Sequence, residues 1–472
     1  MIQKLCKVCK KCNACQLSNM EYSKQLEYKQ KEIQKLLDKY APVNKIIGMD
    51  NPYNYRNKVQ SWFVMTKGKK IVSGVYQSAT HGIVETDSCN INDKRANEIV
   101  REIRLLMKSF ALFPYDDYTG RGFLRHILIR HGYKSGQIMV TLITGTPIFP
   151  RKNDFIKALL KQCPDITTIV MNVNDTPDKM MLGNNQKVIY GNGYIEDELC
   201  GCKFRISPKS FYQVNSVQTE KLYSKAMEMT ALSGKEKVID AYCGIGTIGL
   251  IASKNAACVT GVELNRDAVH DAIENCKLNG IKNSYFICGD AGDFMVEQSL
   301  KGTKADVVFV DPPRAGCSRD FLRSLHKVRP QKIVYISCNP VTLERDMRYL
   351  TRFYEVKEIQ PVDMFPHTCH VETICLLSKL NAKQYIEINL DMDELDLTDA
   401  EKKATYQEIK DYVLEHSGLK VSSLYIAQVK QKCGIIEREN YNKPKSEDAK
   451  QPQCPPDKEK AIKEALTHFG MI

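Results

Sequence analysis

The spacing of hydrophobic positions changes several times along the chain, and each change predicts a different kind of structure. Residues 21–40 carry apolar and aromatic side chains at helical spacing, among them Leu26 and Ile33, which predicts a helix. From about residue 50 to 205 the apolar runs are short, rich in β-branched residues and bounded by glycine. They predict one helix at about 92–111 and strands at 58–66, 70–77, 123–132 and 136–145.

From about residue 206 to 380, strand-like runs alternate with helical stretches. The strand-like runs read VIDAYCG, CVTGVEL, SYFICGD, ADVVFVDPP and KIVYISCNP. Alternation of this kind predicts an α/β domain with a parallel, doubly wound sheet, as in Rossmann-like folds. The remaining residues, 381–472, predict a small helical extension interrupted by a polar, proline-containing segment at 442–459.

Length and composition add limits to this pattern. A chain of 472 residues with 43% hydrophobic residues is too long for one ordinary core, so several domains are expected. No run approaches 18 apolar residues, and the first residues, MIQKLCKVCKKC, are charged. We therefore expect a cytoplasmic protein with no membrane partner.

Charge is distributed unevenly around the formal net value of +12. Residues 1–45 hold ten lysines and four acidic residues, whereas residues 381–472 hold 14 basic and 17 acidic residues. An anionic partner such as RNA is therefore expected to meet the N-terminal parts of the chain, and the tail offers no general electrostatic attraction to it. A DNA partner is not expected.

A glycine-rich turn follows the first strand of the α/β region, in VIDAYCGIGTIGL. Gly244 and Gly246 allow close approach of a ligand at a helix N-terminus. Glu263 ends the next strand, and the third and fourth strands lead into Asp290 and Asp311. Since ligands of doubly wound sheets bind outside the carboxyl ends of the strands, these positions predict a nucleotide-type cofactor. An NAD site remains an alternative, because the same turn fits the dinucleotide glycine spacing.

The fifth strand ends in Cys338, followed by the turn-forming pair Asn339 and Pro340, and Glu372 begins a later strand in HVETICLL. A single cysteine is most simply structural, but a thiol and a carboxylate on one rim suit a specific reaction. A thiolate that adds to C6 of a pyrimidine activates C5 for methylation, and a base must then remove the C5 proton. Cys338 and Glu372 supply those two groups.

The motifs DAYCGIGT, FVDPPRAG, ISCNP and HVET, with SPKSFYQVN at 207–215, resemble those of the RNA (uracil-5-)-methyltransferases. The resemblance covers roughly residues 1–380. It implies an S-adenosylmethionine-dependent methyltransferase domain at 206–380, with Cys338 as nucleophile and Glu372 as proton acceptor. It also implies that Gln213, Tyr242, Glu263 and Asp311 contact S-adenosylmethionine. Gly244 and Asp290, which follow strand ends, are expected to contact it as well. Arg314 is implied to hold the substrate side of its loop.

Cysteines are dense at the N-terminus, where Cys6, Cys12 and Cys15 are spaced C-x5-C-x2-C with Cys9 in the first gap. Spacing alone fits a zinc site and an iron–sulfur site equally. Iron–sulfur members of the family that the chain resembles carry this spacing and a fourth ligand downstream. The resemblance therefore implies a [4Fe-4S] cluster on Cys6, Cys12, Cys15 and Cys89, with Cys9 as a departure.

The resulting expectation has four parts: a cysteine cluster and helix at 1–45, a mainly β, RNA-binding domain at 46–205, the methyltransferase domain at 206–380, and the extension at 381–472. Larger family members begin with a small β-barrel, which we expect to be absent. In the central domain, Arg125 and Arg130 are expected to contact phosphates, and Tyr55 or Phe123 to stack on a base.

Three functional hypotheses follow. The first is C5-methylation of a uridine in 23S ribosomal RNA, the usual substrate of the cluster-bearing members, by a monomeric enzyme. The second is the same chemistry on the T-loop uridine of transfer RNA. The third is a non-catalytic RNA-binding assembly factor that kept the fold, against which the intact Cys338, Glu372 and Asp311 argue.

Overall fold

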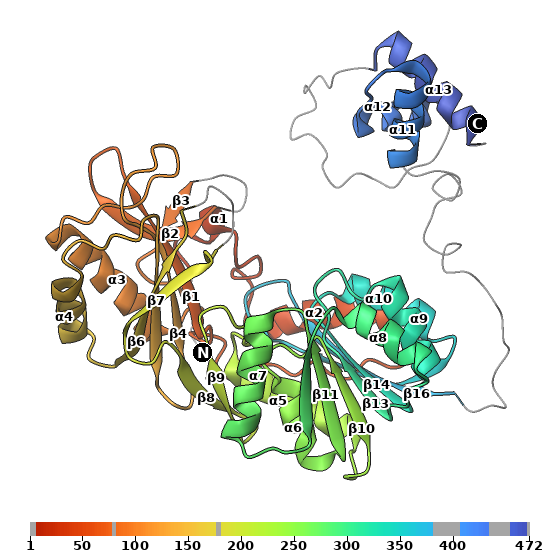
Figure 1. The fold of residues 1–472 in the computed structure, drawn as a ribbon, viewed down its shortest axis with the longest axis horizontal. Helices are drawn as coiled ribbons and strands as arrows, with labels where there is room; N and C mark the ends of the chain where they lie inside the picture. Colours follow the sequence, from red (N-terminus) through yellow and green to blue (C-terminus); the bar gives the residue numbers. More distant parts are fainter. Residues whose placement is uncertain (1–5, 78–81, 176–180, 381–405, 434–453, 470–472) are drawn as a thin grey trace. The chain divides into compact units, whose positions relative to one another are not determined.

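The computed structural model describes residues 6–77, 82–175, 181–380, 406–433 and 454–469. The chain divides into two compact units, residues 1–385 and 386–472. In the described residues the first unit contains two seven-stranded sheets and a two-stranded hairpin, and the second unit contains three helices (Figure 1).

The first sheet belongs to the central part of the chain and has the order β3-β2-β1-β4-β5-β6-β7. Neighbouring strands are antiparallel except β5 and β6. Helices α3 (Lys94–Ser109) and α4 (Lys152–Gln162) cover one face (Figure 1), and alternate residues such as Val59 and Phe63 fill the core beneath them. The strands are β1 (Lys58–Met65), β2 (Ile71–Tyr76), β3 (Ile83–Glu85), β4 (Leu124–His131), β5 (Ile138–Thr144), β6 (Ile166–Val173) and β7 (Asn185–Tyr190). The four strands and the helix predicted from the sequence here are confirmed.

The second sheet has the order β12-β11-β10-β13-β14-β16-β15. Its first five strands are parallel, and β16 is antiparallel to both of its neighbours. The strands are β10 (Lys237–Ala241), β11 (Cys258–Glu263), β12 (Ser284–Cys288), β13 (Val307–Val310), β14 (Lys332–Ser337), β15 (Tyr354–Val362) and β16 (Glu372–Lys379). The five predicted parallel strands are confirmed. The two antiparallel strands extend the sheet beyond the predicted pattern.

Helices cover both faces of the second sheet, so that it is doubly wound. Helices α5, α6 and α7 lie on one side and α8, α9 and α10 on the other (Figure 1). Their bounds are α5 (Ser216–Thr230), α6 (Thr247–Ala252), α7 (Arg266–Leu278), α8 (Ala291–Leu300), α9 (Arg319–Val328) and α10 (Pro340–Leu350), and a 3₁₀ turn (Ser253–Asn255) follows α6. The hairpin of β8 (Ile195–Leu199) and β9 (Cys202–Ile206) buries Phe204 in the same core as Leu222 and Ile248.

The helix that follows the N-terminal cysteines packs against the second sheet, whereas the cysteines themselves lie beside the first sheet. After the short helix α1 (Cys9–Cys12), helix α2 (Tyr22–Leu37) lies against α10 and β15. Its buried positions are Gln25, Lys29, Ile33 and Leu37, four residues apart. The predicted helix is confirmed, although two of its four buried residues are polar. Beyond it, Asn44 and Ile47 donate backbone hydrogen bonds to β15, which extends that edge of the sheet.

The second unit is a small helical bundle. It contains α11 (Tyr406–Ser417), α12 (Ser423–Lys432) and α13 (Pro456–His468), which pack around Val413, Ile426 and Ile462. The helical character predicted for this part of the chain is confirmed for the described residues. Of the polar segment predicted at 442–459, residues 442–453 lie outside the described residues.

Candidate functional site

One edge of the second sheet collects the predicted site residues. The carboxyl ends of the parallel strands β10 to β14 meet at this edge, and the amino end of β16 joins them because β16 runs the opposite way. The edge therefore brings together one predicted site residue from each of six strands. Five lie at or just after the carboxyl ends of the parallel strands, and the sixth is the first residue of β16: Tyr242, Glu263, Asp290, Asp311, Cys338 and Glu372.

The glycine-rich turn after β10 is tied to the end of β11. The Gly244 N–H donates to Glu263 Oε2 at 3.1 Å, and Glu263 Oε1 accepts from the Asn265 N–H at 2.8 Å. Gly246 has φ +81° and immediately precedes α6, a conformation that glycine adopts without strain. Each carboxylate oxygen of Glu263 can accept a further hydrogen bond, so the side chain retains capacity for the hydroxyl groups of a ligand.

Three further residues predicted to contact the cofactor come from different parts of this domain. Asp290 caps α8, since its Oδ1 accepts from the N–H groups of Gly292 at 2.7 Å and Asp293 at 3.1 Å. Tyr242 has φ +65°, and its ring centroid lies 5.5 Å from that of Phe321. Gln213 is buried just before α5. Asp290 therefore already serves as a helix cap, and a cofactor contact by any of the three stays a prediction.

Asp240 is a further candidate site residue, which the sequence did not single out. It lies in β10 with a fully buried side chain, and its Oδ2 accepts from the Gly249 N–H at 2.7 Å. Its Oδ1 meets no hydrogen-bond partner among the described residues. Burial, together with the charges of Asp311 and Glu263, raises the pKa of Asp240 to about 8. A buried oxygen without a partner is costly unless a ligand or water meets it. In the sequence, the signal that could have identified Asp240 is an acidic residue inside an otherwise apolar strand.

Cys338 and Glu372 are brought together by the pairing of β14 with β16. Ser337 is opposite Thr373 in this antiparallel ladder, so the next positions along it are Cys338 and Glu372. The charge of Glu372 acts on the Cys338 thiol, which agrees with this placement. A thiol and a carboxyl group from strands far apart in the sequence are therefore neighbours at the edge of the sheet.

The residues after Cys338 begin a helix rather than a simple turn. Asn339 is the N-cap of α10, where its Oδ1 accepts from the Val341 N–H at 3.1 Å, and Pro340 occupies the first helical position, which needs no N–H donor. Asn339 Nδ2 also donates to the Arg314 carbonyl at 3.0 Å. The cap therefore fixes the nucleophile candidate and ties it to the loop after β13.

Burial governs the protonation of this site. Glu372 is 3% exposed, and burial, helped by the charge of Asp311 and opposed by that of Arg314, raises its pKa to about 8. Partial burial also raises the pKa of Cys338 to about 11, an effect that the charge of Glu372 strengthens and that of Arg314 opposes. Burial raises the pKa of Asp311 to about 7. At neutral pH both Cys338 and Glu372 therefore tend to keep their protons, and Arg314 favours their ionised forms.

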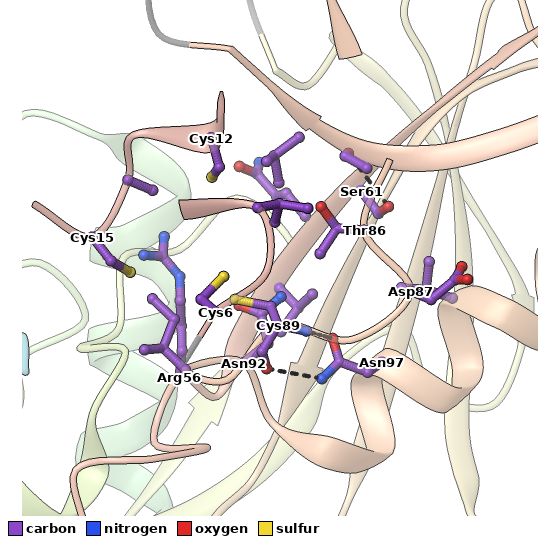
Figure 2. A pocket seen from close by; sticks show the side chains of 18 of the residues that line it. Cys6, Cys12, Cys15, Arg56, Ser61, Thr86, Asp87, Cys89, Asn92 and Asn97 are labelled. Carbon is purple, nitrogen blue, oxygen red and sulfur yellow. Dashed lines mark hydrogen bonds between the residues drawn. The ribbon is translucent and has the colours of Figure 1, made fainter. Parts of the chain in front are cut away.

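The four cysteines predicted as cluster ligands line one cavity of about 290 Å³ in the first unit. Figure 2 shows the sulfur atoms of Cys6, Cys12, Cys15 and Cys89 turned toward the same space, with the Arg56 guanidinium beside them. Among the described residues, no group of three or more His, Cys, Asp or Glu side chains is arranged to hold a metal ion. The cysteines are thus gathered without forming a completed metal site.

The protonation of these cysteines reflects their closeness. Burial, together with the charges of Cys89, Cys12 and Cys6, raises the pKa of Cys15 to about 12. Cys9 lines the same cavity, but its charge is not among the main causes that raise the pKa of Cys15 or Cys89. Its Sγ instead lies 3.8 Å from Asn19 Oδ1. The structure therefore distinguishes Cys9 from the four predicted ligands.

Several residues expected to meet RNA have partners within the protein. Arg125 donates to the Asn174 carbonyl at 2.7 Å and pairs with Asp117, and the buried Arg130 donates to the Ser210 carbonyl. Tyr55 and Phe123 are 8% and 5% exposed. The prediction that one of these two rings stacks on a base is therefore wrong, because both are packed in the interior.

A comparison with solved structures identifies the class of protein. The chain is similar to the Pyrococcus abyssi tRNA (uracil-54, C5)-methyltransferase, solved in complex with S-adenosyl-L-homocysteine. The TM-score is 0.66 and the sequence identity 28%, over 77% of this chain and 85% of that chain. The fold is accordingly that of an S-adenosylmethionine-dependent methyltransferase, and the NAD alternative is set aside.

Sequence comparison then defines the family. The family model described as tRNA (Uracil-5-)-methyltransferase matches residues 21–380. An uncharacterized RNA methyltransferase of Clostridium acetobutylicum is 43% identical over 387 residues, covering 80% of this chain and 84% of that protein. Another, of Caldanaerobacter subterraneus, is 41% identical over 385 residues, covering 80% and 85%. The chain belongs to the RNA (uracil-5-)-methyltransferase family.

In the part of the chain that the structure describes, no helix is both long and apolar enough to cross a membrane.

The coupled pKa values of Cys338 and Glu372 lead to a chemical prediction. Replacing Glu372 by Gln removes a negative charge that raises the Cys338 pKa, so a larger fraction of Cys338 is thiolate at a given pH. We expect Glu372→Gln to speed iodoacetamide alkylation of Cys338 at about pH 9 by roughly three- to tenfold, since the thiolate is the reactive form. Peptide mass spectrometry measures the rate.

Two comparisons accompany that measurement. Arg314→Ala should slow alkylation of Cys338, because the guanidinium lowers its pKa. The exposed Cys288 serves as an internal reference whose rate should not change. An unchanged or slower rate for Cys338 in Glu372→Gln contradicts the predicted coupling.

Proposed function

We propose that the protein methylates C5 of a uridine in 23S ribosomal RNA, in the cytoplasm, through a covalent bond between Cys338 and C6 of the base. The observation that carries this proposal is the meeting of Cys338 and Glu372 across the β14–β16 ladder. One supplies a nucleophile and the other a proton acceptor, at the sheet edge where the methyl donor of this class binds.

The reaction assigns one task to each residue. The Cys338 thiolate adds to C6 of the uracil, and the electron pair of the C5–C6 double bond makes C5 nucleophilic. When bound, S-adenosylmethionine would supply the methyl group: the bond from its sulfonium sulfur to the methyl carbon would break as C5 takes the methyl group, and S-adenosylhomocysteine would be released. The Glu372 carboxylate then accepts the C5 proton, the double bond re-forms, and the C6–S bond breaks with its electrons returning to Cys338. Arg314 favours the thiolate that the first step needs.

The residues around the glycine-rich turn fit S-adenosylmethionine. Asp240 offers a buried oxygen without a partner, and Gly244 and Glu263 form a connected turn next to it. We propose that the cofactor is held by the six residues that the sequence suggested: Gln213, Tyr242, Gly244, Glu263, Asp290 and Asp311. The base must leave its stack to reach Cys338, so unpaired or weakly paired RNA is the expected substrate.

The covalent mechanism is tested with RNA that contains 5-fluorouridine. Fluorine at C5 cannot be removed as a proton, so the reaction should stop at the adduct. With S-adenosylmethionine present, we expect wild-type protein to form a complex with RNA that survives denaturing gel electrophoresis, and Cys338→Ala to reduce its yield at least about a hundredfold.

A matched cysteine variant controls for general effects of losing a thiol. Cys288→Ala removes an exposed thiol at the end of β12 and should form as much adduct as wild type. Equal yields from wild type and Cys338→Ala would falsify the covalent mechanism.

The RNA target has two candidates. The cysteine motif that the chain shares with cluster-bearing family members supports 23S ribosomal RNA. The similarity to the Pyrococcus abyssi enzyme, a tRNA (uracil-54, C5)-methyltransferase by name, supports the T-loop uridine of transfer RNA as the second candidate.

Mass spectrometry of digested RNA from a strain lacking this protein decides between the two targets. We expect 5-methyluridine to fall in 23S ribosomal RNA and to be unchanged in transfer RNA. Re-expression of wild type should restore the nucleoside, and re-expression of Cys338→Ala should not. Loss confined to transfer RNA supports the second candidate instead.

We also propose that Cys6, Cys12, Cys15 and Cys89 hold a [4Fe-4S] cluster. They fit such a group because four soft sulfur ligands line one cavity and raise the pKa of Cys15 together, and a bound metal would stabilise their thiolate forms. Cys9, next to Asn19, is left out of the ligand set.

Metal analysis of protein purified without oxygen tests the cluster. We expect about four iron and four sulfide per chain, as a [4Fe-4S] cluster contains. Cys89→Ser should lose most of both, whereas Cys9→Ser should retain them. Zinc in place of iron and sulfide would overturn the assignment.

A further inference from the structure

The loop between β15 and β16, residues 363–371, leads the chain into Glu372. In this loop His367 has φ +69°, a left-handed backbone conformation that residues with side chains rarely adopt and that is held only when surrounding structure enforces it. Glu372 follows five residues later and His370 three residues later. His370 Nε2 lies 3.4 Å from Arg314 Nη2. The direction that the chain takes at His367 therefore affects both Glu372 and Arg314.

The backbone of His367 is bonded on both sides by the N-terminal segment. Its N–H donates to Gln25 Oε1 at 2.9 Å, and its carbonyl accepts from the Leu17 N–H at 2.9 Å. Gln25 Nε2 lies 3.2 Å from the Nδ1 atom of the His367 ring and donates to the Met20 carbonyl at 2.8 Å. The Gln25 side chain, which is fully buried, thus bonds both the backbone and the ring of one strained residue.

Two further contacts join the same segment to the loop. Lys29 Nζ pairs with Asp363 Oδ1 at 2.6 Å, and both side chains are fully buried. Gln16 Oε1 accepts from the Cys369 N–H at 3.3 Å. The N-terminal segment therefore holds the loop at its start, at its strained residue and near its end.

The polar residues on the buried stripe of α2 are those that bond the loop. Gln25 and Lys29 occupy the first two positions of this buried stripe. The apolar residues Ile33 and Leu37 occupy the next two. Burying an amide or an ammonium group is unfavourable unless its hydrogen bonds are made. The two polar residues direct α2 to one particular backbone conformation of the loop, which an apolar stripe alone does not specify.

We propose that Gln25 is a positioning residue for Glu372. By fixing His367 in its left-handed conformation, it aims the proton acceptor at the site beside Cys338 without touching the substrate itself. This inference rests on the proposed function. It assigns to the N-terminal segment a role in the last chemical step, separate from any role of its cysteines.

The test uses Gln25→Leu, which keeps the size of the side chain and removes its bonds to His367. Addition to C6 requires Cys338, and only the removal of the C5 proton requires Glu372. With ordinary uridine RNA, the variant should therefore accumulate a methylated protein–RNA adduct, detected on denaturing gels with radiolabelled S-adenosylmethionine. We expect kcat to fall about ten- to a hundredfold, as small misplacements of reacting groups cause, with KM for RNA within about twofold.

Gln30 on the same helix provides a matched control. Gln30 Oε1 accepts from the Ile46 N–H at 2.7 Å, and its Nε2 donates to the Asn44 carbonyl at 3.1 Å. It makes the same kinds of bond as Gln25 but not to the loop, so Gln30→Leu should turn over without accumulating adduct. Glu372→Gln should accumulate the methylated adduct to the fullest extent, because this variant lacks the proton acceptor. It therefore provides the reference for the Gln25 variants.

A second substitution covers the case in which Gln25→Leu does not fold. Gln25→Glu keeps an acceptor for the His367 N–H and loses the donor, and it should show a weaker accumulation of the same adduct. The adduct formed with 5-fluorouridine RNA should remain at the wild-type level in every folded Gln25 variant, because that reaction does not reach proton removal.

Two outcomes overturn this inference and leave the proposed function standing. One is turnover without adduct accumulation in folded Gln25 variants. The other is an equal loss of turnover and of adduct formation on 5-fluorouridine RNA, which indicates general damage to the site. If wild type itself forms no adduct with 5-fluorouridine RNA, the proposed function fails, and this inference fails with it.

Discussion

The antiparallel pairing of β16 with β14 is the constraint on which the site depends. Parallel strands bring their carboxyl ends to one edge of the sheet, and only a strand that runs the opposite way can bring its first residue there. Because Ser337 lies opposite Thr373, Cys338 and Glu372 become neighbours. A shift of one residue in this register would turn Glu372 to the other face of the sheet, and the two groups would no longer meet.

Burial gives the same edge its chemical character. It raises the pKa values of Asp240, Asp311 and Glu372 to between about 7 and 8, so these acids can change protonation near neutral pH. A positive charge brought to the edge favours their ionised forms, as Arg314 already does for Glu372. The apolar packing that builds the sheet and the acid–base behaviour of the edge are therefore two consequences of one arrangement.

Local pattern and motif order predicted the parts of this protein that depend on neighbouring residues in the sequence. The parallel strands of the second sheet follow from their apolar runs, and the motifs located Cys338 and Glu372 at strand ends that the structure brings together. Long-range packing was not predictable in this way. Gln25 and Lys29 look like the polar face of α2 but face the interior, since their partners lie more than 300 residues away. Tyr55 looks available for stacking but is buried for the same reason.

The contact between α2 and the loop before β16 also constrains how the protein is made. Lys29 and Asp363 are separated by 334 residues, and a ribosome that adds about 5–20 residues per second needs roughly 20 seconds to a minute to synthesise that length. Throughout that interval the N-terminal helix has formed no contact with its eventual partner. The loop between β15 and β16 is therefore what allows α2 to dock, and the site is complete only when both ends of the first unit have emerged.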